Sequence, residues 1–123
     1  MVQKEFYGYQ RENGIVGVRN HVALISVDAL ANRVVEGISK LIRGTIPITH
    51  PYGRLQFGED LDLTFDTLIG TGSNPNVSAV LVVGLEPVWT QRVVDGISET
   101  KKPVESVTII HKGDHKALEE GAR

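Results

Sequence analysis

The chain has 123 residues, a formal net charge of −2, 41% hydrophobic residues and 23% charged residues. This composition is typical of a soluble globular protein, and a chain of this length can bury a sizeable core, so we expect one domain. The absence of cysteine excludes disulfides, thiolate metal sites and a thiol nucleophile. A scattered, near-neutral charge argues against nucleic-acid binding, and no apolar run reaches the ~20 residues of a membrane-spanning helix. We therefore expect a cytoplasmic protein that binds neither nucleic acid nor membrane.

The first expected element is an N-terminal β-hairpin. Residues 6–18 contain two short extended segments around Glu12-Asn13-Gly14, and an Asn-Gly pair favours a tight turn because both residues tolerate positive φ. The composition then predicts buried strands, of which the second contains Pro47 and is expected at a sheet edge. The expected strands are 22–27, 45–49, 79–84 and 105–111.

Apolar residues at helical spacing follow each strand. The helices are expected to begin near Asp28, Asp60, Glu86 and Asp114. Strands that alternate with helices form parallel βαβ units. The sequence therefore predicts an α/β fold: a single Rossmann-like, three-layer domain over residues 1–123, with a parallel sheet of about four strands.

One internal similarity supports this order. The segment Arg33–Ser39 returns as Arg92–Ser98, which two equivalent crossover helices would explain; chance similarity between amphipathic helices is the alternative. Because glycine inside a helix costs about 1 kcal/mol relative to alanine, Gly37 and Gly96 are expected to let each helix approach the sheet closely.

Polar residues follow the predicted strands at the edge of the sheet where ligands of open parallel sheets bind. Asp28, His50 and Glu86 would suit a divalent cation; alternatively, both carboxylates are helix N-caps and His50 is a surface imidazole. The loop 50–58 suggests binding, with Arg54 as a clamp for a carboxylate and His50 as an acid or base near neutral pH. A purely structural loop is the alternative. As an exposed loop residue, Arg54 is expected to make few core contacts and to add little to stability.

Three motifs stand out: Gly8-Tyr9-x-Arg11-x-Asn13-Gly14-x-x-Gly17-Val18-Arg19-Asn20-His21, His50 to Asp60, and Asn74-Pro75-Asn76-Val77. Through these motifs the sequence resembles the altronate/galactarate dehydratase (UxaA-type) family. Sugar-acid dehydratases of this family usually carry cysteines where this chain has Asp28 and Arg54. The form His-Pro-Tyr-Gly-Arg-Leu-Gln at 50–56 is more similar to the large subunit of sulfolactate sulfo-lyases.

The resemblance implies the amino-terminal Rossmann-like domain of a larger lyase. Such an enzyme removes water or sulfite from a small anionic hydroxyacid, generally with iron or another divalent metal. The expected partners are the remaining lyase domain or a small companion subunit, and a homo-oligomer is left open. The isolated chain is expected to be inactive and to bind metal weakly, because Asp28, His50 and Glu86 supply at most three ligands.

The resemblance and the residue types together give the following site. The catalytic candidates are His50 and Arg54, and the substrate-binding candidates are Arg19, Asn20, Gln56, Asn74 and Asn76. The metal candidates are Asp28 and Glu86. The alternative function is a non-catalytic binding or assembly module, whose polar loops contact a partner domain of a multi-subunit enzyme.

Overall fold

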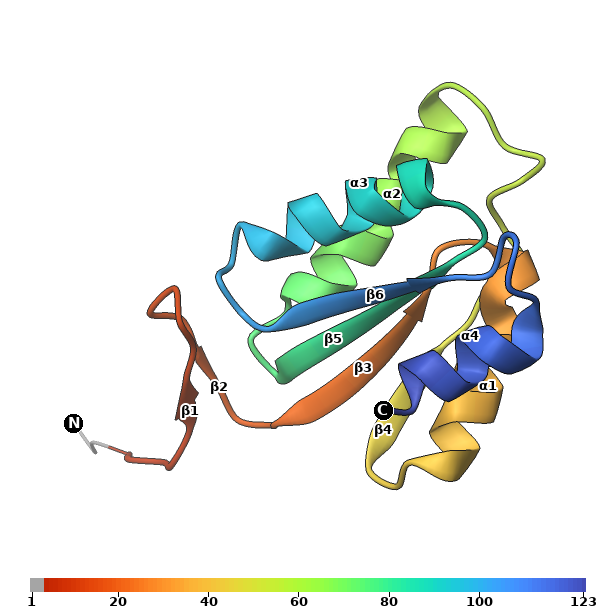
Figure 1. Cartoon of the computed structure of the whole chain (residues 1–123). Helices are drawn as coiled ribbons and strands as arrows, with labels where there is room; N and C mark the ends of the chain where they lie inside the picture. Colours follow the sequence, from red (N-terminus) through yellow and green to blue (C-terminus); the bar gives the residue numbers. More distant parts are fainter. Residues whose placement is uncertain (1–3) are drawn as a thin grey trace.

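A computed structural model describes residues 4–123 (Figure 1). The chain starts with an antiparallel hairpin and continues with alternating strands and helices, as predicted. The elements are β1 (Tyr9–Gln10), β2 (Val16–Gly17), β3 (His21–Ser26), the 3₁₀ turn η1 (Ala29–Ala31), α1 (Asn32–Leu41), β4 (Thr45–Ile48), α2 (Glu59–Ser73), β5 (Val77–Gly84), α3 (Pro87–Ser98), β6 (Val104–Thr108) and α4 (Asp114–Gly121).

Most boundaries agree with the prediction to within two residues, and two differ by three or four residues for local reasons. Asp28 caps the 3₁₀ turn rather than an α-helix, so α1 begins only at Asn32. Strand β6 ends at Thr108 instead of continuing to residue 111, because the chain turns at His111, whose φ is 65°. Within residues 4–123, no helix is long and apolar enough to cross a bilayer.

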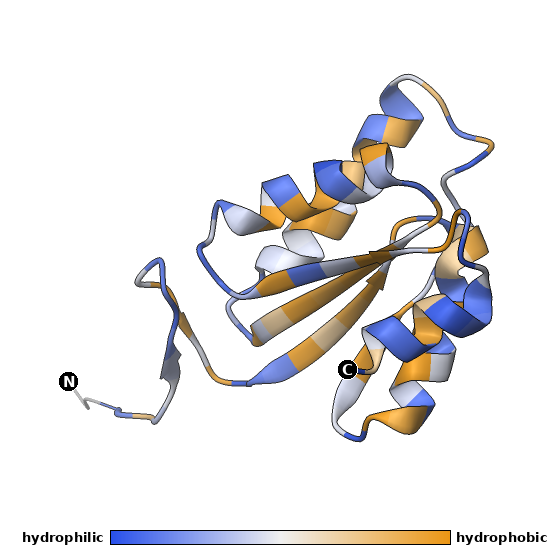
Figure 2. Cartoon of the chain, in the orientation of Figure 1, coloured by the Kyte–Doolittle hydropathy of each residue, from blue (hydrophilic) through white to orange (hydrophobic). Residues whose placement is uncertain are grey.

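The four main strands form one parallel sheet in the order β4-β3-β5-β6. Helices α1 and α4 cover one face and α2 and α3 the other, which confirms the three-layer α/β prediction (Figure 1). Buried apolar residues lie on both faces of the sheet, and Figure 2 shows hydrophobic residues along the central strands and a mixture of hydrophobic and hydrophilic residues along the helices. Phe65 and Ile97 pack on one face, and Val34 and Ile38 on the other.

The connections leave the two central strands in opposite directions. The unit β3-α1-β4 runs to one side and β5-α3-β6 to the other, so a topological switch point lies between the carboxyl ends of β3 and β5. The two similar segments, Arg33–Ser39 and Arg92–Ser98, lie in α1 and α3. They are therefore equivalent crossover helices of the two halves, as predicted.

The two helical glycines serve a different contact from the one predicted. A Cβ atom on Gly37 would collide with Leu118 of α4, and one on Gly96 would lie 2.5 Å from Cδ1 of Ile69 in α2. Both glycines therefore allow neighbouring helices to approach each other. The prediction of close contact with the sheet is wrong, because local periodicity does not reveal which element lies opposite a helix face.

Replacing Gly96 by alanine is expected to lower the free energy of unfolding by about 1–2 kcal/mol. Overpacking against Ile69 outweighs the gain in helix propensity. Gly70 is the matched control: it also lies in a helix, but no atom lies within 4 Å of its Cβ position. Gly70→Ala should raise the free energy of unfolding by up to about 1 kcal/mol in urea denaturation. A loss of similar size in both variants would contradict the packing explanation.

Candidate functional site

The loop between β4 and α2 crosses the switch point. The backbone N–H of Ala29 donates to the carbonyl of Tyr52 at 3.0 Å, which holds the loop against the end of β3. Gly53 has a φ of 116°, and a Cβ atom on it would lie 2.6 Å from Cβ of Asp28. Only glycine combines this backbone conformation with so close an approach, so Gly53 brings the following residue, Arg54, over the site.

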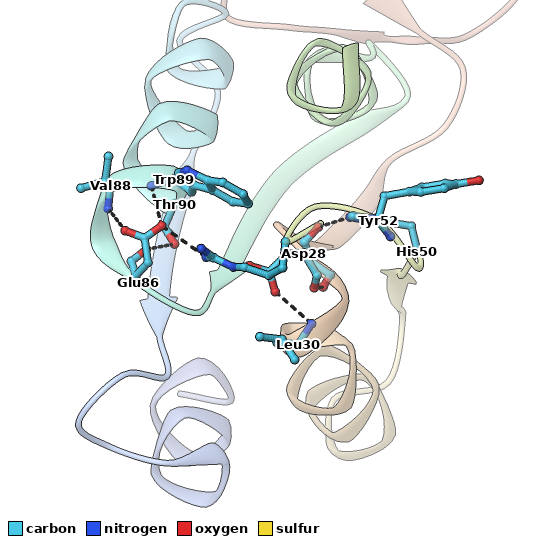
Figure 3. A network of polar contacts seen from close by, with 10 residues as sticks. Asp28, Leu30, His50, Tyr52, Glu86, Val88, Trp89 and Thr90 are labelled. Atoms are coloured by element: carbon cyan, nitrogen blue, oxygen red, sulfur yellow. Dashed lines mark hydrogen bonds and ion pairs between the residues drawn. The ribbon is translucent and has the colours of Figure 1, made fainter. Parts of the chain in front are cut away.

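Arg54 bridges the ends of the two central strands. Its Nε donates to Oδ2 of Asp28 at 2.8 Å, and its Nη2 lies 3.4 Å from Oε1 of Glu86. The guanidinium carbon also lies 4.0 Å from the centroid of the Trp89 ring. Figure 3 shows Asp28 and Glu86 on either side of this network, with Trp89 beside it. The loop is thus tied to both halves of the sheet by one side chain.

This geometry changes the interpretation of Arg54. The prediction that it makes few contacts is wrong, because it pairs with Asp28, whose exposed fraction is 0%, and lies over Trp89. Its effect on stability stays a prediction. One guanidinium between two carboxylates leaves the cluster with a net charge of about −1 at neutral pH. An incoming carboxylate would have to compete with Asp28 and Glu86 for the same donors, so the role of Arg54 as an anion clamp stays a prediction.

Both carboxylates also cap helices, as the structural alternative expected. Asp28 Oδ1 accepts the N–H of Leu30 at 2.9 Å. Glu86 accepts the N–H groups of Val88 at 2.6 Å and Trp89 at 3.0 Å. Burial raises the pKa of Glu86, but these backbone hydrogen bonds and the Arg54 side chain outweigh it and lower the pKa below its usual value. Glu86 is therefore ionised at neutral pH and is a weak base.

His50 uses both ring nitrogens in backbone contacts. Its Nε2 lies 2.8 Å from the carbonyl oxygen of Ser26, which can only accept, so Nε2 carries the proton. Its Nδ1 accepts the N–H of Tyr52 at 3.2 Å. Asn32 Nδ2 also donates to the His50 carbonyl at 2.8 Å. The imidazole is thus a neutral link between β3 and the loop, and acid or base catalysis by it stays a prediction.

The three metal candidates do not fit a divalent ion in this arrangement. The carboxylate oxygens of Asp28 and Glu86 and the ring nitrogens of His50 all have protein partners. A guanidinium already lies between the two carboxylates, where a cation would have to bind. In the part of the chain that the structure describes, no three His, Cys, Asp or Glu side chains form a metal-binding group.

Four of the substrate-binding candidates lie at the opposite end of the sheet. Arg19 and Asn20 precede β3, and Asn74 and Asn76 precede β5, so all four lie at the amino ends of these parallel strands. With six residues in β3, this end is about 20 Å from the switch point. The predicted residues therefore do not form a single compact site.

Asn20 and Asn76 connect the hairpin to the body of the domain. Asn76 Oδ1 accepts the N–H groups of Val18 at 2.9 Å and Arg19 at 3.1 Å. Asn20 Oδ1 accepts from Nη1 of Arg11 at 2.9 Å. These contacts give Asn20 and Asn76 structural roles, while binding of a substrate by either residue stays a prediction.

A groove between β4 and α2 nevertheless connects several candidates. One hollow of about 360 Å³ is lined by His50 and Gln56, and Gln56 Oε1 accepts the hydroxyl of Thr64 at 2.6 Å. A second hollow of about 250 Å³ is lined by Arg19, Asn74 and Asn76. The two hollows share Ile48 and Thr71 as lining residues. Five predicted residues thus lie along one groove, and Asp28, Arg54 and Glu86 line neither hollow.

Sequence reasoning missed three residues that hold these sites together. Arg11 donates to the Pro75 carbonyl at 2.6 Å and to the Arg19 carbonyl at 2.7 Å, and only its place in the hairpin motif signals this. Trp89 covers Arg54, and its spacing three residues after an N-cap is the available signal. Lys102 is buried and donates to backbone carbonyls, yet nothing in the segment Lys101-Lys102-Pro103 distinguishes it from a surface lysine.

Comparisons with known proteins match this sequence to a family. The model of "D-galactarate dehydratase/Altronate hydrolase, second domain" matches residues 8–123. The chain is 55% identical over 120 residues to the (2R)-sulfolactate sulfo-lyase subunit beta of Chromohalobacter salexigens, a match that covers 98% of this chain and 31% of that protein. It is 32% identical over 92 residues to the altronate dehydratases of Bacillus subtilis and Escherichia coli, which covers 67% of this chain and 18% and 19% of those proteins.

The chain therefore spans less than a third of the length of these curated relatives. No solved structure matches the chain significantly.

Replacing Arg54 by methionine is expected to lower the free energy of unfolding by about 2–3 kcal/mol, because the buried Asp28 loses its cation. Adding Asp28→Asn should recover most of this loss, since the amide that replaces the carboxylate is neutral and its Oδ1 can still accept the Leu30 N–H. Urea denaturation of the two single variants and the double variant at pH 7 measures the coupling.

The matched control is Arg92→Met. Arg92 forms a single ion pair, 2.9 Å to Asp62, and like Arg54 it lies over an aromatic ring, Phe65 at 4.2 Å. Its pair is exposed at the surface, so its loss should cost less than about 1 kcal/mol. Equal losses in Arg54→Met and Arg92→Met would show that the burial of Asp28 does not matter.

Proposed function

The chain belongs to the D-galactarate dehydratase/altronate hydrolase family, and from this premise we propose that it forms one domain of a lyase that eliminates sulfite or water from a small hydroxylated acid. The observation that carries the choice of leaving group is the 55% identity, over 98% of this chain, to a sulfolactate sulfo-lyase subunit beta. Sulfite is therefore the proposed leaving group, and a sulfonated hydroxyacid the proposed substrate.

The proposed reaction is a β-elimination. A base removes the proton on the carbon next to the carboxylate, and the electron pair of that C–H bond forms a C=C bond. The C–S bond breaks, and sulfur leaves with the bonding pair as sulfite. The resulting enol takes up a proton on carbon and loses its hydroxyl proton, which gives a 2-keto acid. The reaction needs a base, and positive groups that stabilise the charge developing on the carboxylate.

The candidate residues of this domain are better suited to bind and orient the substrate than to transfer its proton. Arg19, Asn20, Gln56, Asn74 and Asn76 are the proposed groups for the substrate anion. The catalytic candidate Arg54 lies at the other end of the sheet, about 20 Å from Asn74 and Asn76. A small acid cannot reach both ends, so Arg54 is proposed to act by holding the loop at the rim that a partner domain covers.

His50 could serve as a base only if the Tyr52 N–H released its Nδ1. We therefore place the base in another domain or in a companion subunit, as we do the ligands of any divalent metal.

An assembly function is the second candidate, and exposed apolar side chains favour it. Five such side chains, each with more than half of its surface exposed, lie around the switch point: Leu30, Tyr52, Leu55, Phe57 and Val88. A surface of this kind is typical of a face that packs against another domain. In this case the chain would position a partner domain without touching the substrate.

Calorimetry tests the proposed origin of the metal ligands. Titration of the 123-residue chain with Mn(II), or with Fe(II) under reducing conditions, should show no stoichiometric sub-micromolar binding, because the oxygens of Asp28 and Glu86 are engaged by Arg54 and backbone N–H groups. Tight binding that is lost in Asp28→Ala or Glu86→Ala would place the metal inside this domain.

Product analysis tests the reaction. The chain is incubated with sulfolactate and a panel of sugar acids, in the presence of Fe(II), alone and together with the companion subunit and the remaining lyase domain. We expect sulfite and a 2-keto acid from sulfolactate in the complete assembly and no turnover by the chain alone. Turnover of a sugar acid without sulfite release would assign water as the leaving group. Tight assembly without turnover of any acid would favour the assembly function.

A further inference from the structure

The smaller hollow of the groove has a lining of hydrogen-bond donors. It lies where β3 and β5 begin, beside the edge strand β4. Its polar lining includes Arg19, His21, Asn74 and Asn76, and its apolar lining is Ala23, Ile46, Ile48 and Val77. Among residues 4–123, no carboxylate lines this hollow. The combination of donors and an apolar floor restricts the ligands that it fits.

Backbone contacts fix the orientation of both asparagine side chains. The N–H groups of Val18 and Arg19 point to Oδ1 of Asn76, and the N–H of Asn76 points to Oδ1 of Asn74 at 2.9 Å. Because an N–H group can only donate, these atoms must be the carbonyl oxygens. Each Nδ2 group is therefore left as a donor, and within the described part of the chain neither has a hydrogen-bond partner.

The charges around the hollow are predominantly positive. Arg19 is exposed and forms no ion pair with residues 4–123; its guanidinium only approaches the Val18 carbonyl, at 3.5 Å. Behind the asparagines, the ammonium of Lys102 donates to the carbonyls of Asn74 at 2.8 Å and Val77 at 2.9 Å.

The nearby charges also act on Lys102 itself. Burial, and then the positive charge of Arg11, lower the pKa of Lys102, and the opposing effect of Glu12 is smaller. At Lys102, therefore, the positive charge of Arg11 outweighs the negative charge of Glu12.

We propose that this hollow binds a small organic anion, a carboxylate or sulfonate of two or three carbons. Its charged head would accept hydrogen bonds from Arg19, His21 and the two asparagine Nδ2 groups, and its carbon chain would lie against Ile46 and Ile48. The proposal adds a binding site to the proposed lyase function and rests on that function for the identity of the anion. It assigns the recognition of that anion to the amino end of the sheet, away from the switch point.

Titration of the ¹⁵N-labelled 123-residue chain with sulfoacetate tests the proposal. We expect saturable shifts of the side-chain NH₂ signals of Asn74 and Asn76. Inorganic sulfate is the second probe: it should bind about tenfold more weakly, because it has no carbon chain to contact the apolar floor. Equal affinity for the two anions would identify an inorganic oxyanion site and overturn the organic assignment.

Two variants separate binding from folding. Asn74→Asp keeps the Oδ1 that accepts the Asn76 N–H, yet it replaces the donor by a negative charge. Arg19→Met removes an exposed cation without disturbing the core. Each should weaken sulfoacetate binding at least about tenfold, the effect of one charge-assisted hydrogen bond. Arg33→Met, an exposed arginine at the start of α1, is the matched control and should bind like the wild type.

Three outcomes would overturn the proposal. They are unchanged sulfoacetate binding in Asn74→Asp and Arg19→Met, an equal loss of binding in Arg33→Met, and the absence of a saturable shift of the side-chain NH₂ signals. The lyase function fails separately. If sulfoacetate binds saturably in this hollow but the complete assembly turns over no acid, the anion site is supported and the lyase function is rejected. If the assembly turns over its substrate, Arg19→Met does not change this turnover and sulfoacetate does not bind, the lyase function is supported and the anion site is rejected.

Discussion

A buried carboxylate at the end of β3 is the constraint on which the carboxyl edge of the sheet depends. Asp28 is inaccessible to solvent, and an ionised carboxylate in that position needs a cation and hydrogen bonds to offset its desolvation. Arg54 supplies the cation, and Gly53 allows the chain to come close enough to deliver it. The loop after β4 is therefore ordered by charge pairing across the switch point, with little apolar burial of its own.

Because of this pairing, the usual ligand position of such a sheet and the hydrogen-bond donors without a carboxylate partner lie at opposite edges of the sheet. The switch point is where ligands of open parallel sheets usually bind, but here Arg54 is already paired there with Asp28 and Glu86. The donors that have no carboxylate partner lie at the amino ends of the strands, around Asn74 and Asn76. An anion would therefore meet a net negative cluster at one edge and a positive one at the other.

The fold could be predicted from the sequence because each element has a local signal. Strand composition, helical spacing and the N-cap residues Asp28 and Glu86 locate every strand and helix without knowledge of their neighbours. The packing role of Gly37 and Gly96 could not be predicted, since Leu118 and Ile69 lie on other helices and far along the chain. For the same reason, neither the pairing of Arg54 nor the tautomer of His50 follows from the sequence, because each depends on partners from other segments.

The separation of the candidate residues into two groups, in contrast, could have been predicted from their order in the sequence. A residue that precedes a strand of a parallel sheet lies at its amino edge, and one that follows lies at its carboxyl edge. Arg19 and Asn76 precede strands, whereas Asp28 and Glu86 follow them.

The edge strand β4 keeps the groove open between these two edges. It has only four residues, pairs with β3 alone and contains Pro47, which lacks an N–H group with which to pair another strand. Because strand addition is disfavoured there, the side of the groove formed by Ile48 stays accessible to a small ligand or to a partner's side chains.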